Sequence, residues 1–133
     1  MLVLRLTQML KGEKVYIGAP GSVRDYMYVD DHVNAYLLAI KNAKPKCQVY
    51  NGGTGVCTSN KELAEMIAEK IGYDKKRTVF GSYPPGYPYR PPISDQPYIV
   101  LESSKIRKEL NWAPKVPLSE GIAKVISYFK SRC

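Results

Sequence analysis

Residues 21–31, with the sequence GSVRDYMYVDD, and the helical pattern that follows them place the strongest constraint on the fold. A glycine turn opens this segment, and the aromatic and β-branched run at residues 26–29 predicts a strand. Asp30 is expected to cap the next helix, because its carboxylate can accept hydrogen bonds from the first helical turn. Apolar residues then recur on one helix face, at Val33, Tyr36, Leu37 and Ile40. The segment therefore predicts a turn, a strand and a helix in succession.

The remainder of the chain predicts further helices alternating with short strands. Helices are expected before Gly12, from the capping box of Ser59 and Glu62 to Gly72, after Ser103 or Ser104, and from Leu118 onward. Strand patterns occur at residues 15–17, 48–50 and 78–80, and residues 98–101 are expected to be extended. Residues 82–92, SYPPGYPYRPP, contain too much proline for regular structure and predict an irregular loop. About five helices without a repeat or a long linker predict one α/β unit spanning residues 1–133.

The net charge of +8 admits two interpretations, a nucleic-acid surface or a site for an anionic small molecule on a basic protein. The lysines are scattered, and short basic clusters at residues 41–46 and 75–77 follow predicted helices, where cations complement the helix dipole. The eleven tyrosines show no alternating basic and aromatic pattern of a nucleic-acid surface. The charge pattern therefore disfavours nucleic acid, although a basic nonenzymatic binding or interaction module stays as the alternative.

Other residue types narrow the class of protein. No apolar run approaches the roughly 20 residues of a membrane span, and the N-terminal segment lacks a signal-peptide pattern, so a cytoplasmic location is expected. Cys47, Cys57 and Cys133 are odd in number and lack metal-ligand spacing, and His32 is the only histidine. We therefore expect free thiols, with neither a disulfide framework nor a metal site.

Two arginines are candidates for anion binding. Arg24 follows a glycine turn at the mouth of a strand, although it could instead form a surface ion pair with Asp25. Arg90 lies in the proline-rich loop and is followed by Asp95 and Tyr98. Loops that a rigid scaffold holds in place often carry binding residues. The two guanidinium groups could together clamp a diphosphate, since each presents a fork of donors.

Gly52, Gly53 and Gly55 lie between a predicted strand and a predicted helix, where a phosphate cradle could form. The dinucleotide fingerprint would need a further glycine where Thr58 stands, and the chain has no Gly-Lys-Ser/Thr sequence. We interpret the glycines as a tight strand-to-helix turn.

Four segments, taken in order, resemble the C-terminal part of a known enzyme family. They are VLRLTQMLKGEKVYIG, GSVRDYMYVDDHVNAYLLAI, VYNGGTGVCTSNKELAEMI and SSKIRKELNWAPKVPLSEGI. The family is the extended short-chain dehydrogenases/reductases, in particular the NAD-dependent nucleotide-sugar epimerases and dehydratases typified by UDP-glucose 4-epimerase. The resemblance covers nearly the whole chain and implies the substrate-binding portion of a Rossmann-type enzyme, without its N-terminal dinucleotide-binding half.

The resemblance also implies roles for individual residues in binding a UDP-like nucleotide sugar. Arg24 would bind the diphosphate with Tyr26 beside it, and Arg90 would be the second arginine of the clamp. Asp95 and Tyr98 would belong to the same site. The strand residues Val15, Tyr16 and Ile17 would contact the base.

The parts that the family uses for chemistry are missing from this chain. No tyrosine is followed four residues later by lysine, and no Gly-x-x-Gly-x-x-Gly sequence occurs, so no residue is assigned a catalytic role. We expect NAD in the complete enzyme only, none bound by this chain alone, and no activity of the chain alone. A separate N-terminal NAD-binding half or a second copy is the expected protein partner. The resemblance implies that residues 48–50 form a strand of the cofactor-binding sheet, so apolar surface and a strand edge would otherwise be uncovered. The resemblance leaves epimerisation, 4,6-dehydration and decarboxylation open.

Overall fold

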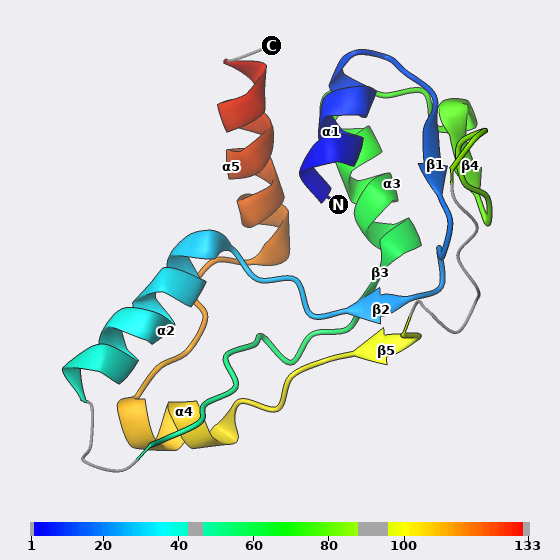
Figure 1. The fold of residues 1–133 in the computed structure, drawn as a ribbon. Coiled ribbons are helices and arrows are strands. Elements are labelled where there is room, and N and C mark those ends of the chain that lie inside the picture. The colour runs from blue at the N-terminus through cyan, green and yellow to red at the C-terminus, as the bar shows by residue number, and fades with distance from the viewer. Residues whose placement is uncertain (1, 43–46, 88–95, 132–133) are drawn as a thin grey trace.

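A computed structural model describes residues 2–42, 47–87 and 96–131, which form an α/β structure (Figure 1). Its helices are α1 (Leu2–Leu10), α2 (Val29–Lys41), α3 (Asn60–Ile71), α4 (Ser104–Leu110) and α5 (Leu118–Lys130), with a 3-10 turn η1 (Lys75–Arg77). Its strands are β1 (Val15–Ile17), β2 (Val23–Arg24), β3 (Thr58–Ser59), β4 (Thr78–Phe80) and β5 (Tyr98–Ile99). The predicted class, short strands with about five helices, is confirmed; the prediction of a single unit over residues 1–133 stays a prediction.

The strands form two small sheets whose partners are distant in sequence. β1 pairs in parallel with β4, with Val15 opposite Thr78. In the other sheet β2 is the central strand, antiparallel to β3 and parallel to β5. Parallel pairing requires a long crossover, and the chain between β1 and β4 contains α2 and α3. The central position of β2 fixes the backbone of Arg24 from both sides.

The main core lies between α1, α3, α5 and strand β1. Figure 1 shows α1 beside α3 with α5 next to them, and the three helices contact one another. Leu6, Val15 and Ile67 are at most 2% exposed, and Met9, Leu63, Ile122 and Ile126 join them. The predicted apolar faces of these helices are therefore buried against each other, as the spacing of their apolar residues requires.

A smaller core joins α2 to α4 and the segment that follows it. Ala35 of α2 packs with Ile106, Leu110 and Trp112, and the Trp112 side chain is 1% exposed. The Trp112 indole Nε1 donates to the Asp31 carbonyl oxygen at 3.1 Å, and the Val116 N–H donates to the Asp31 carboxylate at 2.9 Å. The buried Asp31 thus ties the start of α2 to the chain leading into α5.

The sequence predictions around α2 are partly wrong. The predicted strand at residues 26–29 is instead β2, which ends at Arg24, and α2 begins at Val29 after Tyr28. Asp30 is not the cap, because it lies inside the first turn, where its negative charge still faces the positive end of the helix dipole. Contacts with distant residues accompany the difference, since Asp25 is bound to Thr54 and Tyr26 to Asn60.

The strand predicted at residues 48–50 is also absent, since the described chain provides no neighbouring strand for it. Lys105 Nζ donates to the Val49 carbonyl oxygen at 3.0 Å, and the Tyr50 hydroxyl donates to Glu109 at 2.8 Å. Side chains of α4 therefore form hydrogen bonds with the Val49 carbonyl oxygen and the Tyr50 hydroxyl of this segment. β5 (Tyr98–Ile99) lies within the segment predicted to be extended, residues 98–101.

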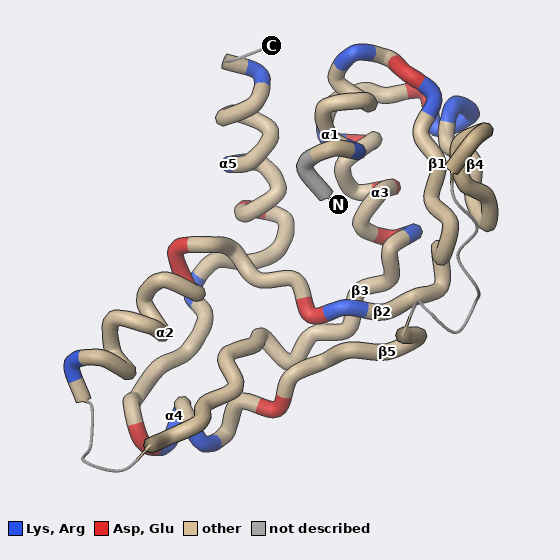
Figure 2. Tube along the Cα trace, in the orientation of Figure 1, with Lys and Arg blue, Asp and Glu red and all other residues tan. Residues whose placement is uncertain are grey.

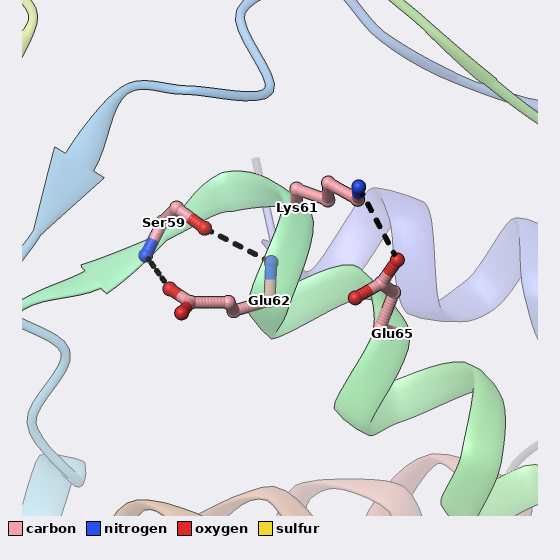
Figure 3. Close-up of polar contacts among 4 residues, drawn as sticks. All are labelled: Ser59, Lys61, Glu62 and Glu65. Atoms are coloured by element: carbon pink, nitrogen blue, oxygen red, sulfur yellow. Dashed lines mark hydrogen bonds and ion pairs between the residues drawn. The ribbon is translucent and has the colours of Figure 1, made fainter.

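The predicted capping box at the start of α3 is confirmed (Figure 3). The Glu62 N–H donates to Ser59 Oγ at 3.1 Å, and the Ser59 N–H donates to Glu62 Oε2 at 2.7 Å. Gly72 ends the helix in the left-handed region, with φ of 70°, which glycine adopts without steric cost. Both helix ends are thus fixed by local sequence.

Asp25 connects three segments that are far apart in sequence. Its carboxylate accepts hydrogen bonds from Thr54 N–H at 3.0 Å, Gly55 N–H at 2.9 Å and Leu101 N–H at 3.3 Å, and also from the Thr54 hydroxyl. A Cβ on Gly53 would lie 2.5 Å from the Asp25 carboxylate, so the turn can approach only with glycine at that position. Asp25 thus holds the glycine turn against β2 and the segment after β5.

We predict that Ser59→Ala lowers the free energy of unfolding by about 1 kcal/mol, because the Glu62 N–H loses its cap. Glu65→Gln is the matched control on the same helix. Glu65 forms only an exposed ion pair with Lys61, at 3.9 Å (Figure 3), and its loss should cost about 0.3 kcal/mol or less. Urea denaturation followed by circular dichroism measures both values, and equal losses for the two variants would contradict the role of the cap.

We predict that Asp25→Asn destabilises the chain by about 1–2 kcal/mol at neutral pH, because an amide cannot accept all these hydrogen bonds. Burial alone would raise the pKa of Asp25, but hydrogen bonds from the Thr54 side chain and from the Gly55, Thr54 and Leu101 backbone lower it below its ordinary value of 3.8. The carboxylate therefore contributes stability above that ordinary value, and this contribution is lost as pH falls through the lower pKa of the folded state.

Urea denaturation at a series of pH values tests this assignment. The difference between wild type and Asp25→Asn should shrink as the solution is acidified below the ordinary carboxyl pKa of 3.8. Asp30→Asn removes an equal charge from an exposed site in α2 and should cost only about 0.5 kcal/mol. A gap between wild type and Asp25→Asn that stays constant with pH would show that the carboxylate charge is not what stabilises the turn.

Candidate functional site

Arg24 and Tyr26, which the resemblance assigns to one site, both line a cavity of about 310 Å³. The wall is built from several elements, and most of it is apolar. Its described residues are Arg5 and Met9 of α1, Ile17 of β1, Arg24, Tyr26, and Asn60, Leu63, Ala64 and Ile67 of α3. An apolar wall with a few polar groups is the usual composition of a small-molecule site.

Arg24 is presented by the central strand β2. The Val23 N–H donates to the Pro97 carbonyl oxygen at 2.8 Å, and the Asp25 N–H donates to the Ile99 carbonyl oxygen at 3.0 Å, so the backbone around Arg24 is held by β5. The guanidinium Nη1 donates to the Val23 carbonyl oxygen at 2.8 Å. Asp25 does not neutralise this cation among the described ion pairs, since its oxygens accept the hydrogen bonds of the glycine turn.

Tyr26 is fixed by a buried asparagine that the sequence analysis missed. Its hydroxyl donates to Asn60 Oδ1 at 2.7 Å, and Asn60 Nδ2 donates to the Ala19 carbonyl oxygen at 2.8 Å. Burial raises the pKa of Tyr26 above its ordinary 10.0, and the charge of Arg24 offsets part of this rise. The Tyr26 hydroxyl is therefore held in its neutral form as the donor of the hydrogen bond to Asn60.

The signal for Asn60 was present in the sequence. Asn60 shares the spacing i, i+3, i+4 and i+7 with Leu63, Ala64 and Ile67, so a polar residue stands on an otherwise apolar inward face. Its side chain is among the buried polar groups, at 7% exposed. Arg5 was also missed, because the sequence analysis predicted only a helix before Gly12 and assigned no role to its polar residues.

The three predicted base contacts on β1 occupy different surroundings. Ile17 lines the cavity, whereas Val15 is 0% exposed in the main core. Tyr16 lies on the opposite side of the strand, as alternation requires, with Lys14 Nζ 5.6 Å from its ring centre. Among these residues only Ile17 is brought to Arg24 and Tyr26.

Of the three other predicted site residues, only Tyr98 lies in the described part of the chain. Tyr98 pairs with Val23 in the sheet, but its side chain is 59% exposed, and its hydroxyl lies 3.0 Å from Cys57 Sγ. It does not line the cavity among the residues described there. Arg90 and Asp95 lie outside the described residues, so the two-arginine clamp they were predicted to complete stays a prediction.

The glycine turn does not fit the phosphates of NAD. The Thr54 and Gly55 N–H groups donate to Asp25, and the Gly53 N–H donates to Ser103 Oγ at 2.8 Å. A phosphate cradle needs such amide groups to be available to the ligand. The predicted tight strand-to-helix turn is only partly right, because no strand directly precedes these glycines among the described residues and the irregular segment leads into β3 before α3. The amide groups of residues 53–55 are nevertheless occupied by contacts within the chain.

Other predicted features can be placed within the described part of the chain. Cys47 and Cys57 are free and exposed, whereas Cys133 lies outside it. No cluster of three potential metal ligands occurs among the described residues, and none of their helices has the length and apolar character of a membrane span. Figure 2 shows Lys and Arg spread over several helices and loops. The cytoplasmic location expected from the sequence stays a prediction.

Comparison with known sequences identifies relatives along nearly the whole chain. The family described as GDP-mannose 4,6 dehydratase matches residues 1–125. UDP-glucose 4-epimerase of Mycolicibacterium smegmatis is 36% identical over 125 residues, which are 93% of this chain and 37% of that protein. dTDP-glucose 4,6-dehydratase of Streptomyces griseus is 31% identical over 93% of this chain and 35% of its own length. The chain therefore spans little more than a third of these relatives.

Solved structures give the same result for the fold. UDP-glucose 4-epimerase of Thermotoga maritima, solved with UDP-glucose, superposes with a TM-score of 0.82 at 36% identity, over 98% of this chain and 39% of that chain. MoeE5, solved with UDP-glucuronic acid and NAD, superposes with a TM-score of 0.84 at 28% identity, over 100% of this chain and 42% of that chain. The sequence identities of 36% and 28% are high enough for these structures to support the family as well as the fold.

The resemblance inferred from the sequence motifs is thus confirmed, together with the predicted fold class. The chain belongs to the GDP-mannose 4,6-dehydratase family of NAD-dependent nucleotide-sugar epimerases and dehydratases and corresponds to the C-terminal portion of their Rossmann-type extended fold.

Proposed function

We propose that this chain is the nucleotide-sugar-binding part of an NAD-dependent sugar epimerase or dehydratase, with a UDP-sugar as the ligand class. The observation that carries the proposal is the cavity in which Arg24 and Tyr26 meet an apolar wall. Relatives solved with UDP-glucose and with UDP-glucuronic acid support the choice of ligand.

The chemistry of the cavity suits a nucleotide diphosphate. A guanidinium group can donate two parallel hydrogen bonds to phosphate oxygens, and Arg24 is held by a strand that is paired on both sides. Ile17, Leu63 and Ile67 provide apolar surface for the less polar part of a ligand. Tyr26 is already bound to Asn60, so its orientation is set before a ligand enters.

The proposed role is binding and orientation, and the chain is proposed to be inactive by itself. NAD would be held by the rest of the enzyme, since the glycine turn has its amide groups occupied and no tyrosine here has lysine four residues later. When bound there, NAD would supply the hydride chemistry. The residues of this chain would position the nucleotide and its diphosphate.

We also propose that the rest of such an enzyme covers the apolar stripe of α2, supplied in the same polypeptide or as a separate chain. The stripe consists of Val29, Val33, Tyr36, Leu37 and Ile40, whose exposed fractions run from 47% to 73%. The predicted apolar face of α2 thus exists but is not buried by the described residues. Apolar side chains gathered on one face of a helix are typical of an interaction surface. The relatives are long enough to provide a cover, since this chain spans 37% of one and 35% of another.

We predict that the chain binds UDP weakly and that Arg24→Gln reduces this affinity at least about tenfold, because charged hydrogen bonds to the diphosphate are lost. Weak binding is expected, since part of the wall would come from the rest of the enzyme. Isothermal titration calorimetry with UDP measures both proteins, and circular dichroism checks that the variant folds. Lys108→Gln, on the exposed side of α4, removes the same charge away from the cavity and should bind as wild type.

Two outcomes would contradict this function. One is the absence of UDP binding by wild type, or equal binding by Arg24→Gln. The other is tight, strongly salt-dependent binding to an oligonucleotide of arbitrary sequence that Arg24→Gln does not change, which would favour a basic nucleic-acid module.

We predict that the isolated chain self-associates at micromolar concentration through the α2 stripe, because its natural cover is missing, and that it binds an apolar dye. Leu37→Glu should shift sedimentation toward the monomer and reduce dye fluorescence. Tyr128→Glu on α5 is the matched control, since Tyr128 is 52% exposed but lies outside the stripe. A wild-type chain that sediments as a monomer and binds no dye would contradict the proposal that the stripe needs a cover.

A further inference from the structure

A second arginine, Arg5, lines the same cavity as Arg24 but comes from a different element. Arg5 lies on α1, whose Leu6 and Met9 are buried in the main core at 1% and 3% exposed. The helix is therefore fixed against α3 and α5, which holds the base of the Arg5 side chain in place. Arg24 comes from β2, so packing in two separate parts of the fold brings the two cations to one cavity.

The Arg5 guanidinium is oriented by its own helix. Its Nη1 donates to Gln8 Oε1 at 2.9 Å, and the contact is partly buried. A guanidinium group carries five N–H donors, so this bond and the one from Arg24 to the Val23 carbonyl oxygen use only part of the capacity of each group. Gln8 is neutral, and its contact leaves the charge of Arg5 intact.

The cavity has no compensating acid among its described lining residues. Besides the two arginines, its polar members are Tyr26 and Asn60, and both are neutral and bound to each other. The ion pairs found in the described part of the chain are Lys61 with Glu65 and Lys124 with Glu120, and neither involves an arginine. Two cations in a mostly apolar cavity repel each other, and an anion with two charged groups removes this repulsion.

We propose that Arg5 contacts the diphosphate together with Arg24, so that guanidinium groups from α1 and β2 divide its two phosphoryl groups between them. The proposal rests on the function proposed above and adds a ligand contact, Arg5, to which the resemblance assigned no role. A single arginine would suffice for one phosphoryl group, whereas two from different elements match the separated charges of a diphosphate. Arg5 would therefore make the cavity selective for nucleotides with two phosphoryl groups.

The test compares UDP binding by Arg5→Gln, Arg5→Lys and Lys11→Gln with that of wild type. Arg5→Gln should weaken UDP binding about tenfold, which corresponds to one charged hydrogen-bonded contact. It should also reduce the loss of affinity between low and high salt, because one fewer cation meets the ligand. Arg5→Lys keeps the charge without the fork and should bind between the two. Lys11→Gln changes the net charge equally at an exposed position outside the cavity and should bind as wild type.

Urea denaturation of the same proteins separates a ligand contact from a structural role. The proposal requires that Arg5→Gln and Arg5→Lys keep wild-type stability while their affinities differ. It is overturned if Arg5→Gln binds UDP as well as wild type while Arg24→Gln does not, and the proposed function then still stands. It is also overturned if the affinity of both Arg5 variants falls only in step with their stability. If wild type binds no UDP, both proposals fail together.

Discussion

The carboxylate of Asp25 is the contact on which the arrangement of the candidate site depends. It accepts hydrogen bonds from Thr54, Gly55 and Leu101, which joins β2 to the glycine turn and to the segment after β5. Successive side chains of an extended segment point to opposite sides. Arg24 and Tyr26 consequently face the cavity, while Asp25 between them faces the turn. The alternation explains why an acid stands between two cavity residues without neutralising the arginine.

The other half of the site is fixed by the start of α3. Ser59 and Glu62 cap the helix. Asn60, which directly follows Ser59, uses its side chain to connect the Tyr26 hydroxyl with the Ala19 carbonyl oxygen. The Asn60 N–H also donates to the Ser22 carbonyl oxygen at 2.9 Å. The turn before β2 and the helix after β3 are thus locked together at one residue. The cavity is preorganised because both of its polar sides are held by contacts that need no ligand.

The sequence predicts those parts of the fold whose causes are local. The capping box of α3 depends on residues three apart. The buried faces of α1, α3 and α5 follow from the spacing of their apolar residues, because the helices of this chain cover one another. The strand predicted at residues 48–50 is absent because a strand needs a partner, and no described segment provides one. The role of Asp25 could not be predicted, since its partner Thr54 is 29 residues away.

For the candidate site, the sequence indicated some of the residues that line the cavity and missed others. The resemblance pointed to Arg24 and Tyr26, and both lie at the cavity. The same reasoning could not place Tyr98, because the pairing of β5 with β2 turns its hydroxyl toward Cys57. The resemblance assigned no role to Arg5 or Asn60, and the packing of α1 and α3 brings them to the same cavity as Arg24.

The surface of α2 that is proposed for assembly is separate from the cavity that is proposed to bind the ligand. One face carries Ala35 and packs on Trp112, whose indole N–H also donates to the Asp31 carbonyl oxygen near the start of the helix. The other face carries the exposed stripe, and no residue of α2 lines the cavity among its described residues. A partner on the stripe would stabilise the folded chain by mass action without touching Arg5 or Arg24. Assembly could then strengthen nucleotide binding only by completing the wall of the cavity or by ordering what surrounds it, because the two arginines are already held by α1 and β2.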